Sequence, residues 1–291
     1  MYLKKTLLAC SFLATCTFLT YAIDWNCDSD GKLTITGNGS MEDYEYLIDI
    51  PWFSDKAKVN SLVLDDGVES VGTAAFYSCN RLTNATLPSS VKEINENAFL
   101  QCNNLKSINI PEGVEEIGSH AFAHCSKLDN IVLPSSLTSI GESSFHSCNK
   151  LSDITMPDTI TEIGNSSFCR CVSLENVVLS NNLKVISDNA FNGCNHITEI
   201  VIPEGVEEIG QFAFCHCSNL RKVSLPSTLK VIHKSAFMHC KNLEQINIPH
   251  GVETISMCAF RDCPKLDVLS ITNEETFIGM FAFDKTCTVL K

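Results

Sequence analysis

Apolar positions recur along this chain with a fixed period of 23 residues. One position of the period is always phenylalanine, and in nine of ten cases a cysteine follows three residues later, as in Phe99 and Cys102. A period of this length is typical of solenoids and propellers, in which each repeat packs only against its neighbours. The pattern therefore predicts a repeat array, whose ladder phenylalanines are Phe76, Phe99, Phe122, Phe145, Phe168, Phe191, Phe214, Phe237, Phe260 and Phe283.

The segment from residue 105 to 127 shows the elements within one period. Leu105-x-x-Ile108-x-Ile110 has the L-x-x-L-x-L pattern of a leucine-rich-repeat strand, with its two isoleucines on one face. A Pro-x-Gly turn follows, then a second short extended segment over residues 114–118, then the turn that carries Phe122 and Cys125. We expect a β-rich leucine-rich-repeat solenoid, a right-handed coil of ten 23-residue repeats with a parallel concave sheet and an N-terminal β cap.

Residues 1–22 have the plan of a secretory signal peptide. Lys4 and Lys5 precede an apolar run over residues 7–19, and Ala22 stands at a small-residue cleavage site. The run is short for a bilayer span, although an uncleaved anchor is the alternative. No later run predicts a transmembrane segment, so we expect none in the mature chain.

Three further segments follow the leader. Residues 23–58 depart from the repeat, but residues 32–36 alternate like a half-buried strand and Trp52 and Phe53 supply large apolar side chains. We interpret this segment as an N-terminal cap over the open end of the array, and a small binding domain is the alternative. We predict ten coils over residues 59–288, without insertion or deletion, and a C-terminal end at residues 289–291.

The cysteines follow the repeat rather than a disulfide framework. Nine of the sixteen occupy one equivalent position per coil, where neighbouring side chains point the same way and lie too far apart for good disulfide geometry. We predict buried thiols that pack as small apolar groups. Cys169 and Cys215 lie two coils apart, too far to form a disulfide. Cys27, Cys258 and Cys287 lie off the ladder, and the sequence does not predict their redox state.

Composition narrows the classes of partner. The chain is 44% apolar and 19% charged, which suits a continuous core. Its net charge of −13 becomes −15 when the leader takes two lysines away. A surface of this sign does not attract nucleic acid or anionic lipid.

The outward positions of the predicted strands, which we expect on the concave face, are the candidate binding surface, because curved solenoids bind through their extended concave surfaces. Their side chains are short and polar, with three exposed valines near the middle of the array. A merely solvated sheet face is the alternative. The candidate ligand-binding residues are Asn130, Val132, Asp153, Thr155, Asn176, Val178, Glu199 and Val201.

Catalysis and cofactor binding have little support in the sequence. No nucleophile-elbow, zinc-protease or phosphate-loop motif occurs, and we predict neither a catalytic residue nor a cofactor. The best metal candidates are His216 and His239, each followed by a ladder cysteine, but adjacent side chains diverge and we predict no metal site.

Two further groups of polar residues have a structural and a functional interpretation. The glutamates of the second segment form an acidic stripe that we interpret as a solvated face, with Ca²⁺ binding as the alternative; they include Glu115, Glu116, Glu142, Glu162, Glu207 and Glu208. Sequons at Asn38, Asn84 and Asn165 are candidate glycosylation sites if the source is a eukaryote.

The run Leu-x-x-Ile-x-Ile-Pro-x-Gly-Val-x-x-Ile-Gly-x-x-Ala-Phe-x-x-Cys, at residues 105–125 and again at 197–217, resembles the BspA-type leucine-rich repeat proteins. The resemblance covers all ten coils and extends into the cap. It implies a secreted or cell-surface adhesin or interaction scaffold of a host-associated bacterium or protist, with host or microbial surface proteins and extracellular-matrix proteins as partners. The alternative is a secreted carbohydrate- or metal-binding protein, or an enzyme whose site has no recognisable motif.

Overall fold

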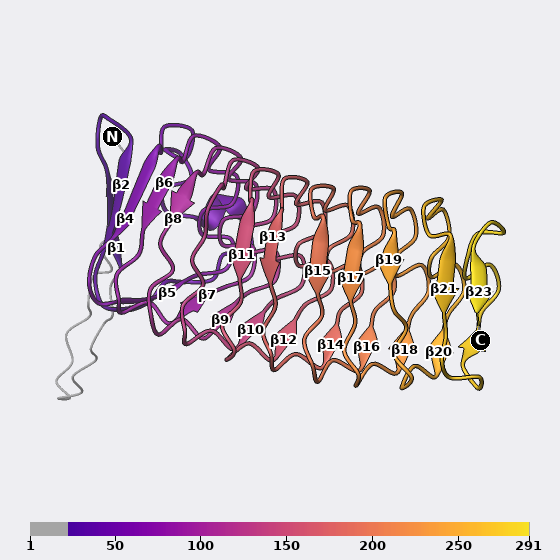
Figure 1. Ribbon diagram of the computed structural model, residues 1–291. Coiled ribbons are helices and arrows are strands. Elements are labelled where there is room, and N and C mark those ends of the chain that lie inside the picture. Colours follow the sequence, from indigo (N-terminus) through magenta and orange to yellow (C-terminus); the bar gives the residue numbers. More distant parts are fainter. Residues whose placement is uncertain (1–22, 291) are drawn as a thin grey trace, which may run out of the picture.

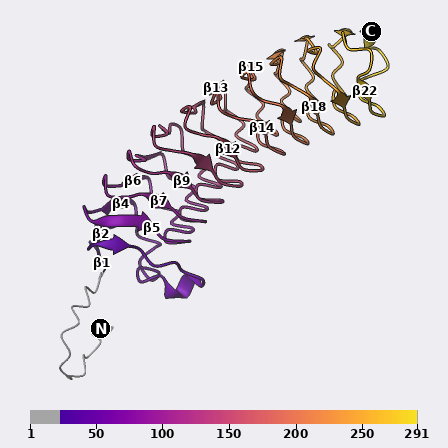
Figure 2. The ribbon, with the colours of Figure 1, turned by 90° about the horizontal axis from the view of Figure 1, so that it is seen from below.

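The structure, a computed structural model, describes residues 23–290. The signal peptide expected over residues 1–22 lies outside this range. The described chain is a parallel β-solenoid whose turns repeat every 23 residues, as the period predicts (Figure 1). Figure 2 shows that the stack of turns bows into an arc from the N-terminal to the C-terminal end.

Two rows of short strands run along the stack. The first row comprises β4 (Ser61–Leu64), β6 (Asn84–Thr86), β8 (Ser107–Ile108), β11 (Asp153–Thr155), β13 (Asn176–Val178), β15 (Glu199–Val201), β17 (Lys222–Ser224), β19 (Gln245–Ile246), β21 (Val268–Ser270) and β23 (Thr288–Leu290). The second row comprises β5 (Val68–Val71), β7 (Glu93–Ile94), β9 (Glu116–Ile117), β10 (Ser139–Ile140), β12 (Glu162–Ile163), β14 (Val185–Ile186), β16 (Glu208–Ile209), β18 (Val231–Ile232), β20 (Thr254–Ile255) and β22 (Phe277–Ile278). We call the outward surface of the first row the strand face.

Where the strands of neighbouring coils pair, they pair in parallel and, along most of both rows, in 23-residue register. Ile154 lies opposite Val177 in the first row, and Ile94 lies opposite Ile117 in the second. Each such residue is equivalent to its partner by sequence, so the same side chain faces the core in successive coils.

The first row is less regular than the sequence predicts. Residues 130–132 were expected to form a strand, but they form none, and the row is interrupted between β8 and β11. Further breaks separate β13 from β15 and β19 from β21. Asn130 and Val132 therefore lie on an extended stretch that follows the strand path without its hydrogen-bond ladder.

The expectation of coils without a deletion fails at the C-terminal end. β23 pairs in parallel with β21, with Thr288 opposite Val268, which is 20 residues later rather than 23. The turn after Phe283 is thus shortened by three residues, and Cys287, four residues after Phe283, does not occupy the ladder position. The first row thereby gains one more strand, β23, at the end of the described chain.

Stacked phenylalanine rings fill the centre of the solenoid, as predicted. From Phe76 to Phe283 the centroids of successive rings lie 5.2 to 5.5 Å apart, and the rings are nearly parallel in the middle of the array. The rings from Phe76 to Phe260 are almost completely buried. Offset parallel aromatic pairs add stabilisation beyond the area they bury.

The third side of each coil is the turn that carries the phenylalanine. Residues two before and two after the ring adopt left-handed backbone conformations, as Ser166 (φ 58°) and Arg170 (φ 60°) do around Phe168. In the next coil Gly193 takes the second position (φ 76°). The N–H of Phe168 donates to the carbonyl of Ala190 in the following coil at 2.9 Å, so the turns are also linked by backbone hydrogen bonds.

The ladder cysteines are buried thiols, as predicted. Cys171 donates from Sγ to the carbonyl of Phe145 in the preceding coil at 3.1 Å, and the same bond recurs from Cys102 to Cys263. All described cysteines are free thiols. The cysteine therefore satisfies a buried carbonyl that would otherwise accept only one hydrogen bond.

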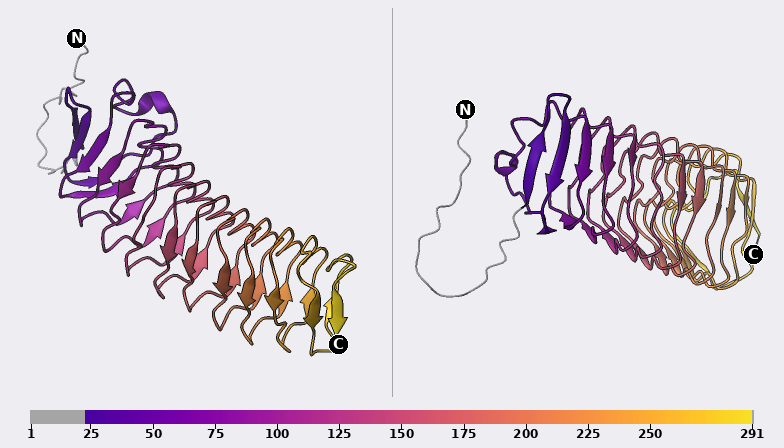
Figure 3. Two further views of the ribbon diagram at one scale, coloured as in Figure 1. Left: turned by 45° about the horizontal axis from the view of Figure 1, so that its top comes forward. Right: turned by 90° about the vertical axis from the view of Figure 1, so that its left-hand side faces the viewer.

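Residues 23–58 lie over the N-terminal end of the stack (Figure 3). β1 (Asp24–Cys27) pairs antiparallel with β2 (Lys32–Thr36), which continues the first row by pairing in parallel with β4. β3 (Gly39–Ser40) continues the second row, and a short 3₁₀ helix, η1, spans Leu47–Asp49.

Trp52 occupies the place of a ladder ring within this segment. Its ring stacks on Phe76 at 5.4 Å, and Trp25 and Tyr44 meet its ring edge-on. Its indole Nε1–H donates to the carbonyl of Ala75 at 3.0 Å. In the coils, a backbone phenylalanine N–H makes the equivalent bond, so one side chain supplies both the ring and the donor.

Candidate functional site

The strand face carries all eight residues that the sequence proposed as ligand-binding. Each is exposed, and Val132, Val178 and Val201 are among the most exposed apolar side chains of the described chain. Six of the eight lie on β11, β13 and β15, and Asn130 and Val132 lie on the coil without a strand. The structure thus places them on four adjacent coils of one surface.

Polar side chains on this surface contact each other across coils. Asn176 donates from Nδ2 to Oδ1 of Asp153 at 2.6 Å, and Ser152 also hydrogen-bonds that carboxylate. These two hydrogen bonds, that of Ser152 foremost, lower the pKa of Asp153 below its usual value. Asp153 therefore stays anionic and fixed in position on the face.

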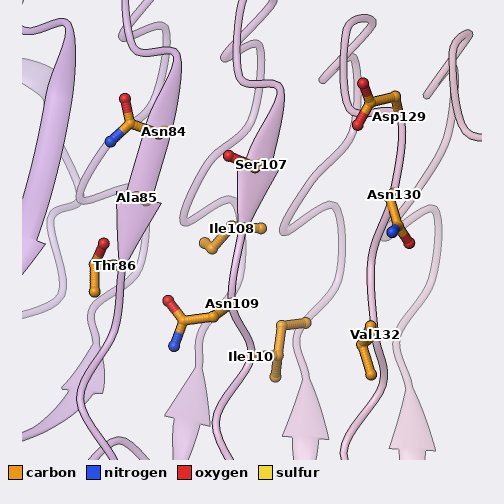
Figure 4. Close-up of a pocket in the computed structure, with 10 residues that line it drawn as sticks. All are labelled: Asn84, Ala85, Thr86, Ser107, Ile108, Asn109, Ile110, Asp129, Asn130 and Val132. Atoms are coloured by element: carbon orange, nitrogen blue, oxygen red, sulfur yellow. The ribbon is translucent and has the colours of Figure 1, made fainter.

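A shallow hollow of about 680 Å³ lies at the N-terminal part of the strand face, where the row of strands is interrupted. Asn84 and Thr86 stand on one side of it and Asp129, Asn130 and Val132 on the other (Figure 4). The hollow opens to solvent between polar side chains, which suits contact with a protruding group rather than enclosure of a small molecule.

Asn109 lines the same hollow, and its side chain binds the backbone directly after β6 of the preceding coil. Its amide accepts from the N–H of Leu87 at 2.9 Å and donates to the carbonyl of Leu87 at 2.7 Å. One side chain thereby satisfies two backbone groups of the preceding coil. Asn109 is accordingly part of the scaffold, although it lies on the candidate surface.

The histidine and cysteine side chains of the metal candidate point to different places, as predicted. The rings of His216 and His239 stack with centroids 4.5 Å apart, whereas the thiols of Cys217 and Cys240 donate inward to phenylalanine carbonyls. Partial burial, then the nearby charges of His239 and Lys241, lowers the pKa of His216. Over residues 23–290, no group of three or more histidine, cysteine, aspartate or glutamate side chains has the arrangement of a metal site.

The acidic stripe of the second row consists of separate side chains, some of them paired. Glu207 contacts Lys230 at 2.6 Å, and Glu208 contacts His233 at 2.8 Å. A hollow of about 400 Å³ lies beside Glu93, Glu96 and Glu116. Exposed pairs of this kind contribute little to stability, and the stripe has the character of a solvated face.

The three sequon asparagines, Asn38, Asn84 and Asn165, are all exposed. Asn84 lies on β6 at the edge of the hollow, so a glycan there would cover part of the strand face. Their glycosylation stays a prediction.

Two residues of the strand face were missed by the sequence analysis. Asp129 and Glu175 each follow the first leucine of their coil, and both are exposed beside the outward strand positions. The sequence could have shown that they are exposed, because the residue after the first apolar position is polar in every coil from Leu82 to Leu266. The alternation rule overlooked them because they precede the strand itself.

Comparison with solved structures gives relatives of the same fold. A leucine-rich repeat protein from Bacteroides ovatus is 25% identical with a TM-score of 0.67, and the match covers 94% of this chain and 81% of that protein. The leucine-rich repeat protein of T. pallidum is 30% identical with a TM-score of 0.52, covering 76% of this chain and 87% of that protein. A leucine-rich repeat protein from Eubacterium ventriosum, at 22% identity and a TM-score of 0.51, is similar in fold over 82% of this chain and 92% of that one.

No curated protein matches the chain. No helix among residues 23–290 is long and apolar enough to cross a bilayer. The BspA type leucine-rich repeat region, described as six copies, matches residues 48–175 and 161–291. The matched ranges take in the coils and the ring of Trp52 that begins the aromatic stack. The chain therefore belongs to the BspA-type leucine-rich repeat family.

Proposed function

We propose that this protein is a secreted or cell-surface interaction scaffold that binds host cell-surface or extracellular-matrix proteins through its strand face. The main support is a group of eight exposed side chains on four adjacent coils, in which Val132, Val178 and Val201 lie among short polar residues. Family membership supports a role in protein interaction and a surface location. The apolar leader at residues 1–22 supports export.

The architecture favours a distributed contact over chemistry. The coils carry no long insertion from which a deep pocket could be built, and the hollow on the strand face is open to solvent. An open sheet surface of short side chains suits a protein partner, because affinity then comes from many modest contacts around a few apolar anchors.

The test is binding of the mature chain, beginning at Ile23, to immobilised matrix proteins and intact host cells. We expect saturable binding that falls at least tenfold in the double variant Val178→Lys with Val201→Lys, because two lysines would be buried against the partner. Val185→Lys is the control, since Val185 is also exposed but lies in the second row. Equal loss in both variants would point to another surface, and absence of binding to every matrix protein and cell would refute this partner class.

A further inference from the structure

The strand face carries a window of uncompensated negative charge. In the four coils that begin at Leu128, Leu151, Leu174 and Ile197, one outward carboxylate per coil is exposed: Asp129, Asp153, Glu175 and Glu199. No lysine or arginine occupies an outward strand-face position in these coils. Three exposed valines of the face, Val132, Val178 and Val201, lie in the same window.

Exposed cationic side chains flank this window on both sides. Lys106 is exposed one coil before it, and Arg221 and Lys222 are exposed one coil after it. Lys222 is the register partner of Glu199, but the charged groups of these two described residues form no ion pair. The sign of the exposed charge therefore changes at each border of the four coils that also present the valines.

None of the four carboxylates takes part in an ion pair within residues 23–290. Elsewhere on the described surface, carboxylates do find cations: Glu244 contacts Lys265 at 3.4 Å and Glu207 contacts Lys230 at 2.6 Å. Asp153 is hydrogen-bonded by Asn176 and Ser152, which orient it without neutralising it. The four carboxylates are therefore not neutralised by an ion pair within the described chain.

The four carboxylates come from successive coils and do not form a metal site among residues 23–290. No described group of three such ligands converges on one point. A row of separated anions interleaved with aliphatic side chains is instead complementary to a row of separated cations interleaved with apolar groups.

We propose that the window from Asp129 to Val201 recognises a protein segment in which lysines or arginines alternate with aliphatic residues. This inference rests on the proposed function, because it names the partner chemistry of the same face. The cations pair with Asp129, Asp153, Glu175 and Glu199, and the aliphatic groups pack on Val132, Val178 and Val201. Sulfated polysaccharides and nucleic acids carry the wrong charge for this surface.

The test uses the mature chain and three synthetic peptides of equal length that alternate Lys–Val, Lys–Ser or Glu–Val. We expect the Lys–Val peptide to bind saturably and more weakly at high salt, and the Glu–Val peptide not to bind. The Lys–Ser peptide tests the valine contacts and should bind more weakly than Lys–Val.

Two matched variants locate the site. One carries Asp129→Asn, Asp153→Asn, Glu175→Gln and Glu199→Gln, and the control carries Glu69→Gln, Glu93→Gln, Glu116→Gln and Glu162→Gln, four exposed residues of the second row. Both variants change the net charge equally. We expect the first to weaken Lys–Val binding about tenfold or more and the control to leave it nearly unchanged, because each exposed charge pair contributes a modest factor.

Equal weakening in both variants, or no saturable Lys–Val binding, would overturn the inference. A chain that binds matrix proteins through Val178 and Val201 but ignores the Lys–Val peptide would overturn this inference and leave the proposed function in place. A chain that binds the peptide through the window but no matrix protein or host cell would support the inference and refute the proposed partner class.

Discussion

The residue before each ladder phenylalanine is alanine in eight coils and serine in two. Ser144 and Ser167 are completely buried, and their hydroxyl oxygens have no hydrogen-bond partner among the described residues. A buried hydroxyl that makes no hydrogen bond loses its hydration without compensation. The other coils show that a methyl group fits at this position, as Ala121 and Ala190 do.

We therefore expect Ser144→Ala and Ser167→Ala each to raise the free energy of unfolding by about 1 kcal/mol, since an unsatisfied buried hydroxyl costs about 1–3 kcal/mol. Chemical denaturation of the single variants measures this. Ser126→Ala is the control, because that hydroxyl donates to the carbonyl of Asn103 at 3.2 Å and its removal should not stabilise. A fall in stability in the two buried-serine variants would show that the hydroxyls have partners.

Thiol reactivity should divide the cysteines into two classes. Burial raises the pKa of the Cys79 thiol to about 12 and that of Cys102 well above its usual value, and both side chains are almost inaccessible. Cys27, Cys258 and Cys287 are only half-buried. Because the thiolate is the reactive form and must be reached by the reagent, we expect brief alkylation at neutral pH to modify these three first.

Peptide mass spectrometry after quenching measures that order. In denaturant, every cysteine should react at a similar rate, which serves as the control. Ladder cysteines that react as fast as Cys27 in the folded chain would contradict the buried ladder.

At the scale of the element, the aromatic stack connects each coil to both of its neighbours. Phe168 lies between Phe145 at 5.2 Å and Phe191 at 5.5 Å and is fully buried. Phe168→Ala should lower the free energy of unfolding by about 3–5 kcal/mol, the usual range for removing a buried phenylalanine ring. Denaturant unfolding measures the change.

Phe283 provides the comparison, because it stacks on one ladder ring and is half-buried. We expect Phe283→Ala to cost clearly less than Phe168→Ala. Equal costs at the two positions would mean that stability does not depend on having a ring on both sides.

The elements differ in how well the sequence predicted them. The phenylalanine stack and the 23-residue pairing followed directly from the period, because equivalent residues must stack when the coil repeats. The break at residues 130–132 did not follow, since Ile131 and Leu133 keep the alternating apolar pattern of a strand and remain buried. Alternation reports which side chains face the core, whereas the hydrogen-bond ladder also depends on the distance between coils.

The sequence predicted only part of the candidate site, because alternation identifies the outward positions only within a strand. The strand positions from Asn130 to Val201 could be read from alternation, because every second side chain must face outward. Asp129 and Glu175 could not, since they stand before the strand, and the shortened turn after Phe283 had no signal beyond a displaced Cys287. The role of Trp52 was foreseen only as a large apolar group, because its bond to the carbonyl of Ala75 depends on where the ring lies.

At the scale of the whole molecule, the fold could be inferred from one sequence because the recurring contacts connect adjacent coils. Strand pairs, ring stacks and thiol bonds all connect a residue with another about one repeat away, as Cys171 is bonded to Phe145. Stability in such an array is close to a sum over coils and the interfaces between them. The fold of the whole array therefore follows from the contacts between one coil and the next.

Removal of one complete coil tests this additivity. Deletion of residues 151–173 joins Lys150 to Leu174, which restores the register of both rows and brings Phe145 against Phe191. We expect a folded chain with unchanged circular dichroism per residue and a melting temperature lowered by a few degrees, because one coil and one interface are lost. Deletion of residues 151–161, about half a coil, is the control and should destabilise the chain more, since the shortened coil loses its first-row strand and cannot pair in register with either neighbour. Unfolding of the full-coil deletion to the same extent as the half-coil deletion would show that stability depends on contacts beyond neighbouring coils.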